Sequence, residues 1–438
     1  MSLSRRGFVA STALAVGTLA SRSAAASGMP NVLCLVADRL PGGILGDARL
    51  LDARLPALEQ IGQSWVRFDA ASAAMLGDGP SWDAIWLGRP GSETGAMREG
   101  QRAARSLPDL SSWIAEKAGL TTFAAGRAGL SGRPTTATVL CDDVGNLQVL
   151  RCMQGFFRNR PAGRPWFATV GLRGLGDLDG WAAAQLGERP PVDLGLAARD
   201  LPKLPSTVRT EAPVARLIQE HAPTPSQWTD AHWQSALWLS ARMLESLDGA
   251  VQRLLASLDA SMHGPNTIVV LTSAQGSPLA CHGRLRPGDL RESCLRVPLA
   301  IRWPRTATAM SSDLPVSTLD IAPTLCAALG IEGLRDARGV NLSPLLDGYP
   351  APSRTMVVTE GLVEGRSVRS REFRYSCWRD DPVSKLAHLP SDPDEARNLA
   401  GNPGYSSTVD SHREALADWE GRLRLTAGAK AGWPGDAR

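Results

Sequence analysis

The segment from Asp78 to Gly88 places a carboxylate, Asp78, and a hydroxyl, Ser81, close together in the chain. A carboxylate can act as a nucleophile when a metal ion or a nearby acid assists it. A serine hydroxyl needs an adjacent base, and the sequence identifies none beside Ser81. Asp78 is therefore the candidate nucleophile, and Ser81 is a candidate substrate-binding residue.

A second acid ends an apolar run. Residues 31–37 read Asn-Val-Leu-Cys-Leu-Val-Ala, and Asp38 follows them. A short continuous apolar run of this kind is typical of a buried parallel strand. Because open α/β sheets bind ligands at the carboxyl ends of their strands, we expect Asp38 to lie in a binding site.

Residues 78–88 resemble the formylglycine motif of the sulfatase family, C-x-P-S-R-x-x-L-L-T-G. Pro80, Ser81 and Gly88 match this motif in type and spacing. Asp78 stands where the family oxidises Cys or Ser to formylglycine, and Trp82 stands where the family has Arg. Since Asp cannot become formylglycine, the resemblance implies a sulfatase-like site without the usual nucleophile.

Further segments follow the family's order, and the resemblance covers most of residues 30–400. They are residues 55–61, 66–68, 119–127, 297–304, 316–331, 339–346 and 392–400. The family's fold is α/β, with a large central, mostly parallel sheet flanked by helices, as in alkaline phosphatase, and a small C-terminal antiparallel subdomain. We therefore expect a signal segment at 1–26, the α/β domain at 27–350 and the C-terminal subdomain and tail at 351–438.

Hydrophobic patterns add expectations for single elements. Residues 165–170 and 266–272 read as buried strands, and residues 232–259 carry apolar side chains at helical spacing. The resemblance predicts a helix within 316–331, and residues 411–425 form a plausible last helix. Residues 177–230 are rich in Pro and Ala and predict a long surface excursion.

The resemblance also implies a calcium site, whose ligand positions fall on Asp38, Arg39, Ala274, Gln275 and Asp78. Three of these positions, Asp38, Asp78 and Gln275, retain a side-chain oxygen, and Asp38 and Gln275 are the candidate metal ligands. Arg39 instead brings a fixed positive charge. We expect no resident calcium, and the alternative is that the site still holds a calcium ion. Arg39 could pair with Asp78 or Asp38 in place of the metal, or it could point into solvent.

Proton transfer in the family depends on histidines that this chain replaces, one of them by Gly176. His282 could donate a proton, or it could be a structural histidine in a turn before Gly283. Arg127, which stands at the position of a family Lys, is a candidate catalytic residue, and Arg286 is a candidate substrate-binding residue. Both could bind an anionic ligand.

Composition and the N-terminus give further expectations. The chain has 438 residues and a net charge of +3, which gives no support for nucleic-acid binding. Residues 4–8, Ser-Arg-Arg-Gly-Phe, resemble a twin-arginine export signal, and the apolar run behind them is too short for a membrane span. We expect a periplasmic protein without a stable membrane anchor. Cys141 and Cys152 could form a disulfide there.

Two functions remain open on this evidence. The first is an exported, sulfatase-like pseudoenzyme that binds an anionic small molecule or a partner without catalysis. The alternative is an active hydrolase of sulfate or phosphate esters, with a rewired site around Asp78.

Overall fold

The computed structural model describes residues 28–46, 50–127, 137–178, 180, 201–209, 228–304, 309–350, 352–362, 364–379 and 381–423. The expected export signal and most of the expected surface excursion lie outside these ranges. Within them, no helix combines the length and the apolar character that crossing a membrane requires.

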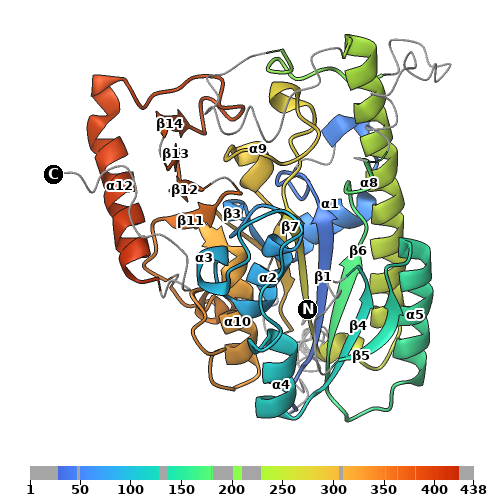
Figure 1. Ribbon diagram of the computed structural model, residues 1–438. Coiled ribbons are helices and arrows are strands. Elements are labelled where there is room, and N and C mark those ends of the chain that lie inside the picture. The colour runs from blue at the N-terminus through green and yellow to red at the C-terminus, as the bar shows by residue number, and fades with distance from the viewer. Residues whose placement is uncertain are drawn as a thin grey trace, which may run out of the picture.

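A mostly parallel sheet forms the centre of the molecule (Figure 1). Its strands are, from edge to edge, β5 (Thr138–Asp142), β4 (Thr121–Gly126), β6 (Trp166–Leu172), β1 (Asn31–Arg39), β7 (Thr267–Gln275), β8 (Leu299–Arg302), β2 (Val66–Phe68) and β9 (Met310–Ser312). The first five strands run parallel to one another, and β8 is antiparallel to both of its neighbours. The expected α/β class, and the three strands expected at 31–38, 165–170 and 266–272, are confirmed.

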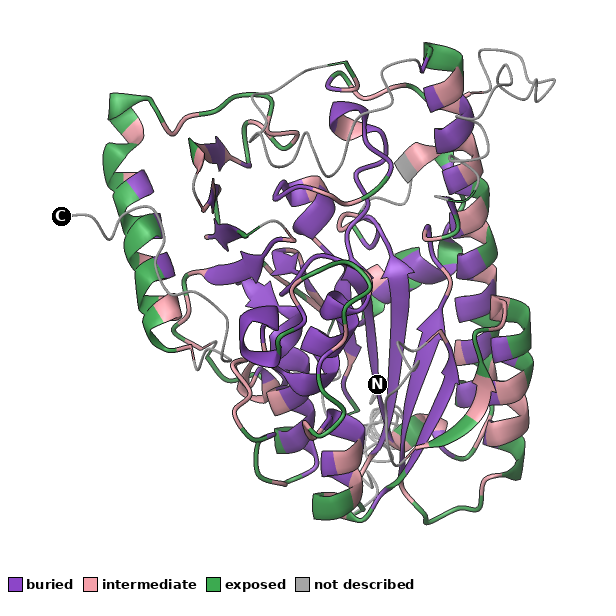
Figure 2. Cartoon of the chain, in the orientation of Figure 1, coloured by how far each residue is buried: buried purple, intermediate pink, exposed green. Residues whose placement is uncertain are grey.

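Helices cover both faces of this sheet because its central strands are apolar on both sides. In β1, Leu33 and Leu35 belong to one core cluster, while Val32, Cys34 and Val36 belong to another. Figure 2 shows the resulting buried central strands between half-exposed helices. The first core contains α1 (Pro56–Ser64), α5 (Asn146–Asn159) and α8 (Asp230–Asp259), and the second contains α2 (Pro80–Leu87), α4 (Leu110–Ala118) and α10 (Ile321–Ala328).

Short elements connect these layers. They are η1 (Leu50–Asp52), β3 (Ala71–Ser72), α3 (Gly91–Thr94), η3 (Gly264–Asn266), η4 (Cys281–Gly283), α9 (Glu292–Leu295), β10 (Val316–Ser317), η5 (Thr318–Asp320) and α11 (Ser343–Leu346). The helix expected within 316–331 therefore begins late. Residues 316 and 317 pair with β3 before α10 starts.

The C-terminal part is a separate antiparallel sheet with a closing helix, as expected. The strands are β11 (Val357–Glu360), β12 (Gly365–Arg369), β13 (Phe373–Trp378) and β14 (Asp381–His388), followed by η6 (Pro403–Tyr405) and α12 (Ser406–Gly421). The helix expected at 411–425 begins five residues earlier, directly after η6. Strand β11 joins the two parts, because the Glu360 amide donates to the carbonyl of Ala74 at 3.0 Å.

The cysteines are free thiols, including the pair expected to form a disulfide. Cys141 lies on β5 and Cys152 on α5. Burial, and a hydrogen bond with Cys152, raise the pKa of Cys141 to about 11. The two thiols are thus neighbours but are not joined.

Candidate functional site

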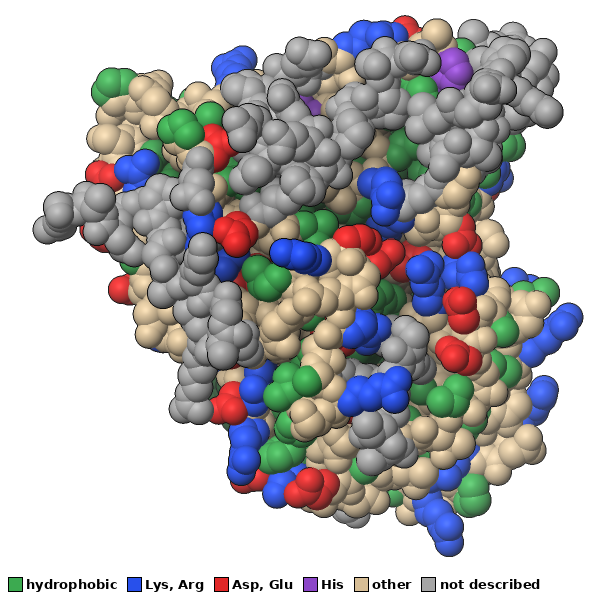
Figure 3. Space-filling view, viewed as in Figure 1, with side chains coloured by type: hydrophobic (Ala, Val, Ile, Leu, Met, Phe, Trp, Pro, Cys, Tyr) green, Lys and Arg blue, Asp and Glu red, His purple; other side chains and the backbone are tan. Residues whose placement is uncertain are grey.

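The carboxyl ends of four adjacent parallel strands meet at one rim of the sheet. Asp38 lies near the end of β1, Arg127 follows β4, Arg173 follows β6 and Gln275 ends β7. Figure 3 shows acidic and basic side chains gathered side by side near the middle of the face of the molecule that is in view. This is the position at which α/β sheets bind ligands.

Asp38 is a buried carboxylate that the backbone holds in place. Its side chain is only 1% exposed. Oδ1 accepts hydrogen bonds from the amides of Arg39 at 2.7 Å, Gly174 at 2.8 Å and Gly176 at 3.2 Å. Burial raises the pKa of the Asp38 carboxyl, while these bonds and the charges of Arg39 and Arg127 oppose the rise.

Glycine at position 176 is what allows this close approach. A Cβ atom there would lie 2.4 Å from Asp38 Oδ2. Any side chain, including the histidine that the family resemblance places here, would collide with the carboxylate as it is now held. Glycine at this position and the amide bonds to Asp38 are therefore linked features of one loop.

The guanidinium of Arg127 spans the two acids of the site. Nη1 donates to Asp38 Oδ2 at 3.4 Å, and Nη2 lies 4.0 Å from Asp78 Oδ2. A third carboxylate, that of Asp177, lies 4.0 Å from Nη1. The Arg127 side chain remains 37% exposed, so it also faces solvent at the rim.

Asp78 is presented by a turn that only glycines adopt without strain. Gly77 and Gly79 on either side have φ of 99° and 96°, and helix α2 begins at Pro80. Asp78 therefore lies two residues before the first residue of an eight-residue helix, whose dipole favours negative charge at this end. Its side chain is 34% exposed.

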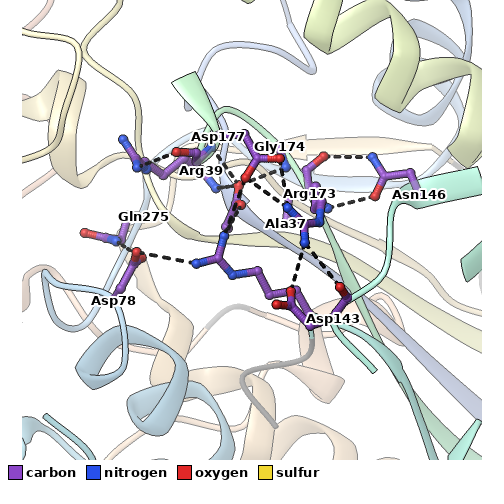
Figure 4. A network of polar contacts seen from close by, with 12 residues as sticks. Ala37, Arg39, Asp78, Asp143, Asn146, Arg173, Gly174, Asp177 and Gln275 are labelled. Carbon is purple, nitrogen blue, oxygen red and sulfur yellow. Dashed lines mark hydrogen bonds and ion pairs between the residues drawn. The ribbon is translucent and has the colours of Figure 1, made fainter. Parts of the chain in front are cut away.

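Gln275 ties this turn to the sheet, as Figure 4 shows. Its Nε2 donates to Asp78 Oδ1 at 3.1 Å, and its Oε1 accepts from the amide of Gly77 at 2.9 Å. Both polar atoms of the Gln275 side chain therefore make bonds within the protein. Asp38, Asp78 and Gln275 thus lie together at the rim.

Arg39 is buried, and only 3% of the residue is exposed. Its Nη2 donates to the carbonyl of Gly176 at 3.1 Å. The alternative in which Arg39 points into solvent is therefore wrong. The guanidinium that bridges the two carboxylates is that of Arg127.

Two predicted site residues, Ser81 and His282, are buried and bond the backbone of the protein. Ser81 is buried in the first turn of α2, and its hydroxyl donates to the carbonyl of Gly77 at 2.8 Å. His282 is buried in a 3-10 turn, and its Nε2 bonds the carbonyl of Asp394 at 2.6 Å. This environment favours the turn-histidine interpretation of His282. The Ser81 hydroxyl is bonded to the backbone of its own helix turn.

Glu99 is a site residue that the sequence did not reveal. Its Oε2 accepts from the amide of Asp78 at 3.2 Å. Burial and the neighbouring Asp78 carboxylate raise the pKa of Glu99, while the charges of Arg286 and Arg39 oppose the rise. The exposed Arg286 therefore lies near the same rim.

Arg173 completes the rim with a second ion network, visible in Figure 4. Its guanidinium bonds Asp177 at 3.0 Å and Asp143 at 3.0 Å, and its backbone amide bonds Asn146 Oδ1 at 2.8 Å. Gly174 and Gly176, shortly after the expected strand, were the available signal for this loop. Of the acids that face Arg173, Asp177 belongs to the same loop and Asp143 follows β5, and neither carried a signal of its own.

Charges of both signs alternate around the rim, and no acidic metal cluster forms. Among the described residues, no group of three or more His, Cys, Asp or Glu side chains is placed to hold a metal ion. The candidate metal ligands Asp38 and Gln275 both accept hydrogen bonds from backbone amides, and Gln275 also donates to Asp78.

Comparison with known proteins identifies the family. The family model described as Sulfatase matches residues 212–331. A Delta 4,5-hexuronate-2-O-sulfatase of Bacteroides thetaiotaomicron is 23% identical, over 92% of this chain and 91% of that protein. These similarities support a member of the sulfatase family.

Solved structures agree on the fold of this sulfatase-family chain. A 2-O GAG sulfatase has a TM-score of 0.79 at 21% identity, covering 91% of this chain and 95% of that one. The phosphonate monoester hydrolase of Agrobacterium radiobacter has a TM-score of 0.73 at 17% identity, covering 90% and 95%. The α/β sheet with its C-terminal antiparallel sheet thus matches the architecture of these sulfatase structures.

Proposed function

We propose that this sulfatase-family protein binds an anionic ligand at the rim of its sheet and does not hydrolyse sulfate esters. The observation that carries the proposal is the state of Asp38. Three backbone amides occupy Oδ1, and the Arg127 guanidinium faces Oδ2. A carboxylate bonded in this way has its charge offset by the protein itself, without a metal ion.

The donor set does not fit calcium, which takes about six to eight oxygen ligands. The oxygens of Asp38 and Gln275 accept backbone amides, and two guanidinium groups, those of Arg39 and Arg127, lie beside them. A divalent cation would be repelled by these fixed charges. We infer that the site works without a resident calcium.

The anion would bind at the exposed part of the rim. Arg127 keeps more than a third of its side chain exposed, and Arg286 is exposed near Glu99. Arginine presents paired N–H groups that match a sulfate, phosphate or carboxylate group. Relatives that act on hexuronate sulfates make a sulfated or carboxylated sugar the ligand class to test first.

The test combines binding with turnover. Purified protein is titrated with inorganic sulfate and with a sulfated disaccharide, and p-nitrophenyl sulfate and phosphate are assayed with and without calcium. We expect binding without turnover, and about tenfold weaker binding for Arg127→Gln, since losing one charged hydrogen-bond donor costs roughly 1.5 kcal/mol. Arg253→Gln, an exposed arginine on α8, is the matched control. Calcium-dependent turnover by the wild-type protein would overturn the proposal.

A second function has its own supporting observation, the pairing of Asp78 with Glu99. The carboxylate of Asp78 would attack the sulfur or phosphorus atom, and the departing alcohol oxygen would take a proton from Glu99, whose pKa is raised. Water would then cleave the mixed anhydride and restore Asp78. Mass spectrometry of Glu99→Gln after incubation with p-nitrophenyl phosphate would detect a trapped phosphoryl group on Asp78. An unmodified protein without turnover favours the first proposal.

A further inference from the structure

A small cavity with charged residues in its lining lies away from the rim, between the α/β part and the C-terminal sheet. Asp289 and Arg291, from the loop before α9, line one side, and Trp378 and Lys385, from β13 and β14, line the other. The space open to the centre of a water molecule is about 30 Å³. That volume holds one or two waters or one small ion.

Arg291 brings unused hydrogen-bond donors into this cavity. Its side chain is 5% exposed, and Nη1 pairs with Asp289 Oδ2. Nε and Nη2 are buried and have no hydrogen-bond partner among the described residues. Buried donors of a charged group are costly to leave unpaired, so this geometry calls for an acceptor.

Lys385 adds a second positive charge beside Arg291. Burial, followed by the charge of Arg291, lowers the pKa of Lys385 to about 8. Within the described part of the chain, its ammonium group has no carboxylate at ion-pair distance, and it lies 6.0 Å from the ring centre of Trp378. Two neighbouring cations in a closed space repel one another unless an anion lies between them.

The nearby carboxylates do not balance these charges. Asp289 is one carboxylate shared among three cations: it pairs with Arg291, Arg284 Nε lies 3.5 Å from its Oδ2, and the charge of Lys385 also acts on it. Glu395 accepts the amide of Glu292 at 2.9 Å, and burial raises the pKa of Glu395 to about 7. At neutral pH that acid is only partly ionised, so positive charge exceeds negative charge around the cavity.

We propose that this cavity binds a small monovalent anion, chloride, between Arg291 and Lys385. The cavity is too small for a sugar, and its lining is distinct from the rim where Arg127 lies. The ion accepts the free N–H groups of Arg291 and offsets its repulsion with Lys385. Because Arg291 and Lys385 come from the two parts of the molecule, the bound ion holds the C-terminal sheet on the α/β part.

Thermal unfolding tests the proposal, with sodium chloride and sodium gluconate compared at equal ionic strength. A ligand that binds only the folded state raises its stability, so we expect a Tm higher by roughly 2 °C in chloride. Lys385→Gln should abolish the difference, and Lys117→Gln, a surface lysine on α4, should keep it. Arg127→Gln should also keep it, which separates this site from the proposed ligand site.

Crystals grown in bromide give the second measurement. An anomalous peak within contact of Arg291 and Lys385 is the expected result, because bromide replaces chloride in such sites. Water molecules alone at that position, or equal Tm values in the two salts for the wild-type protein, would overturn the proposal. Neither measurement uses an Arg291→Gln variant, so both decide the question even if that variant does not fold.

Discussion

At the scale of single residues, the site depends on which group neutralises Asp38. A buried carboxylate needs an opposite charge or several hydrogen bonds, and Asp38 has both in Arg127 and the amides of its own loop. In this arrangement the Arg127 side chain takes the place of a metal ion. Arg39 and Arg127 can both be read from the sequence as positive charges near the site. Their roles depend on side-chain geometry that only the fold fixes.

The contact between Asp38 and Arg127 predicts energetic coupling. In a double-mutant cycle with Asp38→Asn and Arg127→Gln, we expect a coupling of about 1 kcal/mol in the free energy of unfolding. The value is modest because solvent reaches the Arg127 side chain. Urea denaturation of the four proteins measures it. Additive effects of the two substitutions would show that the guanidinium does not stabilise this carboxylate.

At the scale of elements, the loop after β6 and the turn before α2 position the site. The continuous apolar runs made β1, β6 and β7 predictable, because a strand that is buried on both faces carries apolar side chains on both of them. The start of α12 was not predictable from apolar spacing, since η6 precedes it and continues into the helix. Glu99 was missed for a similar reason, because it reaches Asp78 from a loop without a recognisable pattern.

The loop after β6 gives a direct prediction. Gly176→Ala should destabilise the protein by roughly 2 kcal/mol, because its Cβ would lie 2.4 Å from Asp38 Oδ2 and would displace the loop amides. The control is Gly155→Ala within α5, where a Cβ meets no atom within 4 Å. We expect that control to stabilise the protein by about 0.5–1 kcal/mol. Thermal unfolding compares the two, and equal effects would argue against the packed loop.

At the scale of the whole molecule, buried ion pairs fasten the C-terminal sheet to the α/β part. Arg374 on β13 bonds Glu292 of α9 at 2.6 Å, and Arg369 on β12 bonds it at 3.2 Å. Arg374 also reaches the hydroxyl of Ser72 on β3 at 3.2 Å. The family resemblance predicted both sheets, but it carried no information on these connections.

These ion pairs predict a dependence of stability on pH. Despite its burial, the charges of Arg374 and Arg369 lower the pKa of Glu292 to about 2, from 4.5 in the unfolded chain. The resulting stability, about 3 kcal/mol, is present above pH 4.5 and is lost as the pH falls toward 2. Glu292→Gln should cost roughly 3–5 kcal/mol at neutral pH and should flatten the acid limb of the stability profile. An unchanged acid limb in that variant would assign the effect to other carboxylates.

The most direct test of the central claim is the calcium content of the purified protein after dialysis against millimolar calcium, measured by elemental mass spectrometry. If amides and the Arg127 guanidinium neutralise Asp38, the protein should retain far less than one calcium per chain, and added calcium should leave its Tm unchanged. One tightly held calcium per chain would contradict the account, and turnover of p-nitrophenyl sulfate by that form would establish a working sulfatase.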